Sequence, residues 1–389
     1  MMNGFILKHA NIIGADGIVY NTDIKICEGK IADIGIFDEE GIDCTNRYVS
    51  PGFVDIHTHG GYGYDFMDCT QEAFDNILRF HLDNGTTTVL PTSVTAPVAA
   101  VRRFIETART YIRHKPPYAK ICGVHLEGPY LSLKNKGAQK EEYLLNPQRD
   151  DYSFILDNKD IVRTVTIAPE LDTDGSMTGR LSENGIVVCG GHDNGIYPAF
   201  LPSVQNGLKH LTHIFCAMSE LRFEGGVRNV GLREYGLLDD NLTAEIIADN
   251  KHIPSALAKL ILKCKGREKV AVVSDALRCA GMPADGKLYR LGMNQDESAQ
   301  LFRVDDGVAV LADGSRFAGS ITPVHQMVKN LIEAGVAVAD AFRCATINPA
   351  QIIGAEHIGK IEKGYCADIL VLNAKFDIEK IFINGNMYR

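Results

Sequence analysis

The sequence predicts an α/β protein: a (β/α)8 TIM-like barrel with a small β domain built from both chain termini. Eight short apolar segments between residues 52 and 275 have the length and composition of buried strands. Most of them are followed by a stretch in which apolar residues recur with helical spacing. The first fifty and the last thirty-odd residues instead show β-type composition broken by glycine turns. Eight strands alternating with helices over roughly 300 residues are typical of a barrel.

The strand candidates follow one another at regular intervals. They are GFVDIH (52–57), TTTVLPT (86–92), KICGVHLE (120–127), VRTVTIA (162–168), GIVVCGG (185–191), KHLTHIF (209–215), TAEIIAD (243–249) and KVAVVSD (269–275). The first two helical stretches each carry one apolar stripe, formed by Phe74, Ile77, Leu78 and Leu82, and by Val101, Phe104, Ile105, Ala108 and Ile112. A doubly wound open sheet is the alternative. It usually has fewer strands, and no glycine-rich phosphate fingerprint follows the first strand here.

The β segments at the two ends of the chain are each too short to form a stable sheet alone. We expect them to pair into one small domain beside the barrel. The predicted division is 1–52 and 355–389 for this β domain and 53–354 for the barrel.

Composition and charge exclude several classes of partner. The net charge of −9 argues against binding to nucleic acid or to a membrane surface. No apolar run approaches the roughly 20 residues that a membrane helix needs, and the N-terminus lacks the pattern of a secretory signal. The ten cysteines form no CxxC pair, which favours reduced thiols. We therefore expect a cytoplasmic protein.

Histidines and carboxylates gather where the predicted strands end, which is where barrel enzymes carry their chemistry. Seven of the twelve histidines fall within the strand candidates or shortly after them. The strand-end residues are His57 and His59, His125 and Glu127, His192, His213, Asp249 and His252, and Asp275. Because residues two apart on a strand point the same way, His57 and His59 should share one face.

Imidazole and carboxylate groups together are the ligand set of Zn or Fe(II). A divalent ion lowers the pKa of bound water and polarises a carbonyl oxygen, so the pattern favours a metal-dependent hydrolase. Amide hydrolysis also needs a group that shuttles a proton, and Asp275 at the end of the eighth strand is the candidate. The residue pattern leaves His125 unassigned among ligand, oxyanion helper and core residue.

The chain resembles the amidohydrolase superfamily and, within it, the family of N-acetylglucosamine-6-phosphate deacetylases. The resemblance rests on PGFVDIHTHG, GVHLEGPYLSLKNKGAQ, GGHDN, THIFCAM, IIADNKH, VVSDAL, FAGSITP, INPAQIIG and GKIEKGYCADILVLN. These pieces run along almost the whole chain. The HxH pair is shared across the superfamily, whereas HLEGPY followed by KGAQ is more specific to the deacetylases.

The resemblance implies hydrolysis of the acetamide of an N-acetylhexosamine 6-phosphate by a homodimeric enzyme, with N-acetylglucosamine 6-phosphate as the expected substrate and glucosamine 6-phosphate and acetate as the products. It implies a metal ion held by Glu127, His192 and His213, and Asp275 as the acid/base. A second ion held with His57 and His59 occurs in some members, so one or two Zn or Fe ions per chain are expected. The substrate contacts that carry over are Ala138, Cys216, Ala217, His252, Phe317, Ala318 and Gly319.

Three departures from the family pattern concern the substrate pocket. Cys216 stands where the family usually has Asn, and Asn250 and Lys251 precede the substrate histidine. The family's HREPG is replaced by a longer segment that ends GLREYG. This segment supplies Arg233 as the candidate phosphate ligand, because the planar arginine fork matches phosphate oxygens. Arg222 and Arg228 in the same segment are competitors for this role. Because all three departures concern the substrate pocket and none concerns the hydrolytic residues, the reaction class is better determined than the sugar.

Three rival functions were weighed against this one. A dihydroorotase-like hydrolase needs a carboxylated lysine after the fourth strand, but the chain reads TIAPE there. A deaminase does not use a glutamate ligand after the third strand, so Glu127 disfavours it. A binding protein without activity would be expected to have lost ligands, and none of the ligands is missing.

Overall fold

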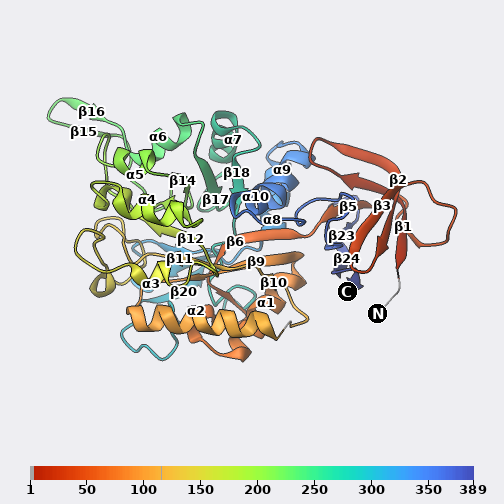
Figure 1. The fold of residues 1–389 in the computed structure, drawn as a ribbon, viewed down its shortest axis with the longest axis horizontal. Helices are drawn as coiled ribbons and strands as arrows, with labels where there is room; N and C mark the ends of the chain where they lie inside the picture. The colour runs from red at the N-terminus through yellow and green to blue at the C-terminus, as the bar shows by residue number, and fades with distance from the viewer. Residues whose placement is uncertain (1–3, 115) are drawn as a thin grey trace.

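The computed structural model describes residues 4–114 and 116–389. Its centre is a nearly closed barrel of eight parallel strands (Figure 1). In order around the barrel these are β6 (Phe53–Thr58), β9 (Thr86–Ser93), β11 (Val124–Glu127), β12 (Val162–Ile167), β13 (Val187–Gly190), β14 (Leu208–Leu211), β17 (Thr243–Ile246) and β18 (Val270–Val272). Beyond the end of β18, the N–H of Asp275 donates to the carbonyl of His57 at 2.9 Å. This bond joins the eighth strand to the first, and the predicted barrel is confirmed.

A helix follows each barrel strand before the next strand begins. These helices are α1 (Gln71–Asp83), α2 (Val98–Arg113), α3 (Ser153–Leu156), α4 (Ser176–Glu183), α5 (Leu201–Gln205), α6 (Leu232–Leu238), α7 (Ser255–Lys265) and α8 (Val324–Glu333). Two more, α9 (Val338–Ala345) and α10 (Ile347–Ile352), complete the barrel's outer layer. The Thr70 hydroxyl caps α1 by accepting from the N–H of Ala73 at 3.1 Å. The predicted stripe of α1 is fully buried, so the barrel holds this helix by its apolar face.

Strands from both chain termini form a second sheet beside the barrel, with red N-terminal and dark blue C-terminal strands together in Figure 1. The N-terminal strands are β1 (Phe5–Ile13), β2 (Ile18–Cys27), β3 (Lys30–Gly35), β4 (Ile42–Asp43) and β5 (Tyr48–Pro51). The C-terminal strands are β23 (Ile369–Leu372), β24 (Ile378–Ile383) and β25 (Asn386–Met387). The joint is the antiparallel pair β5–β23, in which Val49 faces Val371. The sheet has an apolar core of its own, as the short terminal segments required. The sequence-based domain bounds remain a prediction.

Several short strands and turns lie in the segments that connect the barrel's strands and helices. An antiparallel sheet of β19 (Tyr289–Arg290), β20 (Leu301–Asp305), β21 (Val308–Leu311) and β22 (Phe317–Gly319) lies between β18 and α8 in the chain. A hairpin of β15 (Arg222–Glu224) and β16 (Val227–Asn229) projects at the upper left of Figure 1. Short strands β7 (Gly60–Gly61) and β8 (Tyr64–Asp65) pair after β6, and β10 (Lys120–Ile121) pairs with β9. Three 3-10 turns span Phe66–Asp68, Glu141–Tyr143 and Pro169–Leu171.

The inserted sheet is tied to the end of the eighth barrel strand. The N–H of Ser320 donates to the Asp275 carbonyl at 2.9 Å, and the N–H of Leu277 donates to the Ser320 carbonyl at 3.0 Å. These bonds hold the end of β22 against the turn that carries Asp275. Among the described residues, no helix combines the length and the apolar character that crossing a membrane requires.

Candidate active site

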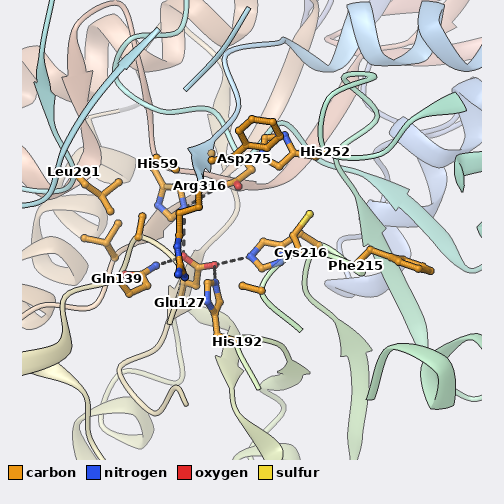
Figure 2. A pocket seen from close by; sticks show the side chains of 18 of the residues that line it. His59, Glu127, Gln139, His192, Phe215, Cys216, His252, Asp275, Leu291 and Arg316 are labelled. Carbon is orange, nitrogen blue, oxygen red and sulfur yellow. Dashed lines mark hydrogen bonds and ion pairs between the residues drawn. The ribbon is translucent and has the colours of Figure 1, made fainter. Parts of the chain in front are cut away.

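A pocket of about 390 Å³ opens at the carboxyl ends of the barrel strands (Figure 2). Its floor includes His59, Glu127, His192, His213 and Asp275. These residues follow five different strands, so the barrel brings together side chains that are up to 216 positions apart (275 minus 59). The structure therefore brings five of the predicted strand-end residues together in one pocket, with His252 in its wall.

Glu127 is the centre of the cluster and is almost completely buried. Its Oε1 lies 3.0 Å from Nε2 of His192 and 3.0 Å from Nε2 of His213. The same oxygen lies 3.5 Å from Nε2 of His57, and Oε2 lies 3.5 Å from Nε2 of His59. Burial raises the pKa of the Glu127 carboxyl, but the charges of His192 and His57 and the hydrogen bonds from His192 and His213 outweigh it. The pKa therefore lies well below its usual value.

Asp275 faces the same cluster from the eighth strand. Its Oδ1 lies 3.2 Å from Nε2 of His59 and 3.7 Å from Nε2 of His57. Burial raises the pKa of Asp275, but the hydrogen bond with His59 and the charges of His57, His59 and His213 outweigh it, so the pKa is lowered. Asp275 is thus ionised at neutral pH.

The donor set fits divalent metal ions. Two groups have ligand atoms within 4.8 Å of one another: His57 with His59 and Asp275, and His57 with Glu127 and His213. Ligands held tetrahedrally about 2.1 Å from zinc are themselves about 3.4 Å apart, which matches the 3.0–3.7 Å separations in this cluster. Nε2 of His57 is buried and has no hydrogen-bond partner among the described residues. Such an atom needs a ligand, and a cation would supply one.

The ligand orientation depends on hydrogen bonds from the other ring nitrogens. Nδ1 of His192 lies 3.0 Å from the Asn135 carbonyl, and Nδ1 of His59 lies 3.2 Å from the Thr92 carbonyl. A carbonyl only accepts, so Nδ1 carries a proton in both rings, and Nε2 is the nitrogen that faces the pocket and becomes a metal ligand when an ion displaces its own proton. This is the arrangement in which metal-binding histidines are held in other proteins.

Several site residues have left-handed backbone conformations, which are unfavourable for residues other than glycine. The φ angle is +48° at His192, +28° at His213 and +45° at Asp275. Each such residue costs roughly 1–3 kcal/mol and persists only where the surroundings enforce it. The strain lies where the chain turns sharply after a strand and directs a side chain inward.

Glu245, inside β17, is a site residue that the sequence analysis missed. Its Oε2 lies 2.9 Å from Nδ1 of His57 and accepts from the N–H of His213 at 3.1 Å. Its Oε1 lies 3.1 Å from Nε2 of His210. Burial raises the pKa of Glu245, but the charges of His57 and His210 and their hydrogen bonds hold it well below its usual value. Glu245 therefore positions His57 through Nδ1 and leaves Nε2 toward the predicted ligands. A glutamate within the apolar run TAEIIAD was the signal that could have revealed it.

His125, left open by the sequence, lies outside the pocket lining. Its Nε2 is 2.7 Å from the Thr166 hydroxyl, and its ring meets that of His57 edge-on, with centroids 4.6 Å apart. Burial and the charge on His57 lower the pKa of His125 to about 3, so its ring is neutral. His125 belongs to a polar layer beneath the site.

The pocket walls contain all the residues that the resemblance implied for the substrate. Ala138, Cys216, Ala217, His252, Phe317, Ala318 and Gly319 all line it. His252 is oriented by Asp249, whose Oδ2 lies 2.7 Å from Nδ1 of His252, and its ring packs against Phe317 with centroids 5.0 Å apart. Burial raises the pKa of the Cys216 thiol well above its usual value, so this side chain presents a neutral thiol.

Arg233 lies outside the pocket lining. Its guanidinium pairs with Glu220 at 3.0 Å and Glu234 at 2.8 Å, and it stacks over the Phe215 ring at 4.9 Å. The competitor Arg222 donates to the side chain and the carbonyl of Asn194.

Gln139 and Arg316 line the pocket, although the sequence analysis did not single them out. The Gln139 amide donates to Oε2 of Glu127 at 2.5 Å, and its carbonyl accepts from the N–H of Thr95 at 2.8 Å. The Gln139 amide thus holds Oε2 of the carboxylate, whereas His192 and His213 contact Oε1 (Figure 2). Gln139 ends the quoted KGAQ stretch, so its motif was recognised while its contact was not.

Comparison with known proteins places this geometry in a family. The model of the Amidohydrolase family matches residues 48–388. The chain belongs to the amidohydrolase family. The resemblance inferred from the sequence is thereby confirmed.

The curated relatives of this amidohydrolase include deacetylases of two amino sugars. The chain is 27% identical over 385 residues to an N-acetylgalactosamine-6-phosphate deacetylase of Escherichia coli O157:H7, covering 98% of each protein. It is 31% identical over 342 residues to the N-acetylglucosamine-6-phosphate deacetylase of Vibrio furnissii, covering 87% of this chain and 82% of the relative.

Solved structures agree with this placement. The N-acetylglucosamine-6-phosphate deacetylase of Pasteurella multocida superposes with a TM-score of 0.89 at 27% identity, covering 99% of both chains. A mutant of the Mycobacterium smegmatis deacetylase, in complex with N-acetyl-D-glucosamine-6-phosphate, superposes with a TM-score of 0.88 at 26% identity, again covering 99% of each chain.

Glu127→Gln should remove most of the bound metal. The amide keeps the shape of the side chain but loses the charge that faces four imidazoles. Metal content per chain, measured by mass spectrometry of the purified variant, should fall well below that of the parent. Full parental metal content in the variant would contradict the assignment of Glu127 as a ligand.

Glu245→Gln should weaken metal binding without contacting the metal. Loss of an outer carboxylate that orients a metal-binding histidine typically costs about 10- to 100-fold in affinity. Competition with a chelator measures this change directly. The matched control is Asp172→Asn, another buried carboxylate, which accepts from the backbone of Met177 and Thr178 at the start of α4. Equal metal affinities in Glu245→Gln and the parent would rule out the positioning role.

Proposed function

We propose that this amidohydrolase removes the acetyl group of an N-acetylhexosamine 6-phosphate, yielding acetate and the amino sugar 6-phosphate. The observation that carries the proposal is the convergence, in one pocket, of the imidazole–carboxylate cluster, Asp275 and the KGAQ and FAGS segments. The named activities of the relatives support the same reaction class.

The proposed cofactor is Zn or Fe, one or two ions per chain, held by Glu127, His192 and His213, with His57 and His59 available for a second ion. When bound, such an ion polarises the amide carbonyl and makes water more acidic. His57 belongs to both possible ligand groups, so the two groups share one residue.

Asp275 is the proposed acid/base. Its lowered pKa keeps the carboxylate ionised, as a base that accepts the proton of the attacking water must be. After attack on the acetyl carbon, the same group returns the proton to the amide nitrogen. The C–N bond then breaks, and the amine leaves as a neutral group rather than as an anion.

The remaining pocket residues bind and orient the sugar in this proposal. His252 presents Nε2 because Asp249 takes up Nδ1, and Phe317 covers the ring of His252 with an apolar surface. Ala138, Ala217 and Ala318 have no long side chains, so they leave room for a bulky polar ligand against the backbone. Homodimer formation remains a prediction from the resemblance, and a cytoplasmic location remains a prediction from sequence composition.

The specificity of the enzyme concerns which of two hexosamines it accepts. Glucosamine and galactosamine derivatives differ only in configuration at carbon 4. The relative matched over 98% of both chains acts, by its name, on the galactosamine derivative. Cys216, a poor replacement for an amide in hydrogen bonding, lies in the same pocket. N-acetylglucosamine 6-phosphate is therefore the first candidate substrate and N-acetylgalactosamine 6-phosphate the second.

Acetate release from four compounds should test the function. The parent enzyme is incubated with N-acetylglucosamine, N-acetylgalactosamine and their 6-phosphates, and acetate is measured. We expect kcat/KM for at least one 6-phosphate to exceed that of its neutral form by a large factor. Preference for a neutral sugar, or no acetate from any of the four, would overturn the proposal.

Asp275→Asn should lose about 10²–10⁴-fold in kcat, the usual contribution of a positioned acid/base. The ion held by Glu127, His192 and His213 should remain, so metal analysis of the same sample separates the two roles. A variant that has lost this ion as well would show that Asp275 supports the metal site instead of shuttling the proton.

A further inference from the structure

The pocket contains an arginine that the reaction does not use. Arg316 lies in the turn between β21 and β22, directly before Phe317, and its side chain reaches into the pocket (Figure 2). Among the described residues that line the pocket, it is the only Lys or Arg. It is solvent-exposed, so its long side chain can reorient at the pocket mouth.

Neighbouring cationic groups already have partners. Arg233 pairs with Glu220 and Glu234, and His252 pairs with Asp249 at 2.7 Å. Lys140, near the pocket, pairs with Glu142 at 2.8 Å and Asp296 at 3.4 Å. Arg316 forms no ion pair with any residue in the described ranges 4–114 and 116–389.

An anionic substrate needs a cation in this pocket. In the proposed reaction the imidazole–carboxylate cluster and its ions face the acetamide, so they are not available to the 6-phosphate at the other end of the sugar. The net charge of −9 on the whole chain does not attract an anion either. A sugar phosphate carries close to two negative charges at neutral pH. A guanidinium binds phosphate through two parallel N–H···O bonds, which gives orientation as well as attraction.

We propose that Arg316 binds the 6-phosphate of the substrate and is the main determinant of selectivity for phosphorylated over neutral sugars. This inference rests on the proposed function, because it names the residue that binds the substrate's phosphate in the same site. Arg233 then has a structural role, bridging Glu220 and Glu234 beside Phe215.

The position of Arg316 couples phosphate binding to the reacting end of the substrate. The strand that follows it is bonded to the Asp275 carbonyl through the N–H of Ser320. Gly319 permits this approach, because a Cβ there would lie 3.0 Å from the Asp275 carbonyl oxygen and 2.9 Å from Cγ of Leu277. A phosphate held by Arg316 would therefore fix the sugar relative to Asp275, which is how remote binding groups assist a reaction.

Arg316→Ala should raise KM for the 6-phosphate substrate about 10- to 100-fold, the usual effect of losing a hydrogen-bonded charge pair. KM for the unphosphorylated sugar should stay at the parental value. Arg316→Lys keeps the charge without the planar fork and should give an intermediate KM. Calorimetric binding of the amino sugar 6-phosphate product, at low and high salt, should show weaker and less salt-dependent binding in Arg316→Ala.

Arg303→Ala is the matched control. Arg303 lies on β20 of the same sheet, pairs with Asp305 at 3.4 Å and does not line the pocket. It should leave both KM values unchanged.

The outcomes separate this inference from the proposed function. A parent enzyme that releases no acetate from any phosphorylated sugar overturns the function, and the inference with it. A parent that prefers the 6-phosphate, together with an Arg316→Ala variant of unchanged preference, overturns the inference alone. In that case, a large rise in KM for the 6-phosphate in Arg233→Ala would assign the phosphate to Arg233.

Discussion

The site depends on the Glu127 carboxylate, a negative charge removed from water at the mouth of the barrel. Burying an isolated ion costs several kcal/mol even after the protein relaxes, so this charge must be compensated where it stands. Imidazoles in or after β6, β13 and β14 surround it, and the Gln139 amide donates to Oε2. Compensation from four separate segments requires the barrel to close with its strands in register. The site therefore forms only when the barrel has folded completely.

A second layer of hydrogen bonds turns the cluster into a set of ligands. Carbonyls of Asn135 and Thr92 hold His192 and His59, and the Glu245 carboxylate holds His57. Each contact occupies Nδ1 and leaves Nε2 facing the pocket. Glu245 does more than its carbonyl counterparts, because its negative charge also makes His57 a more basic ligand. The left-handed turns at His192, His213 and Asp275 complete the arrangement, at a cost in backbone energy that a purely structural strand end would not need.

The barrel and most of the site could be predicted from the sequence because their signals are local. Alternating strands and helical stripes gave the fold, and the two-residue spacing of His57 and His59 gave their shared face. Glu245 was missed because a carboxylate within an apolar strand can face the core, the helices or the strand end, and only the closed barrel shows which histidine it meets. The sequence pointed to Arg233, because it lies in the segment that replaces a family motif, and it gave no signal for Arg316. Which loop reaches the pocket depends on how the inserted β19–β22 sheet folds back onto Asp275, and that contact spans residues distant in sequence.

The central claim is that Glu127, His192 and His213 hold one divalent ion and that His57 and His59 can hold another. The most direct test is a crystal structure of the metal-loaded protein, with anomalous diffraction recorded on both sides of the absorption edge of the bound metal. If the ion is zinc, we expect an anomalous peak about 2.0–2.2 Å from Oε1 of Glu127 and from Nε2 of both His192 and His213. A fully loaded, active protein with its anomalous peak elsewhere, or with none in this cluster, would contradict it.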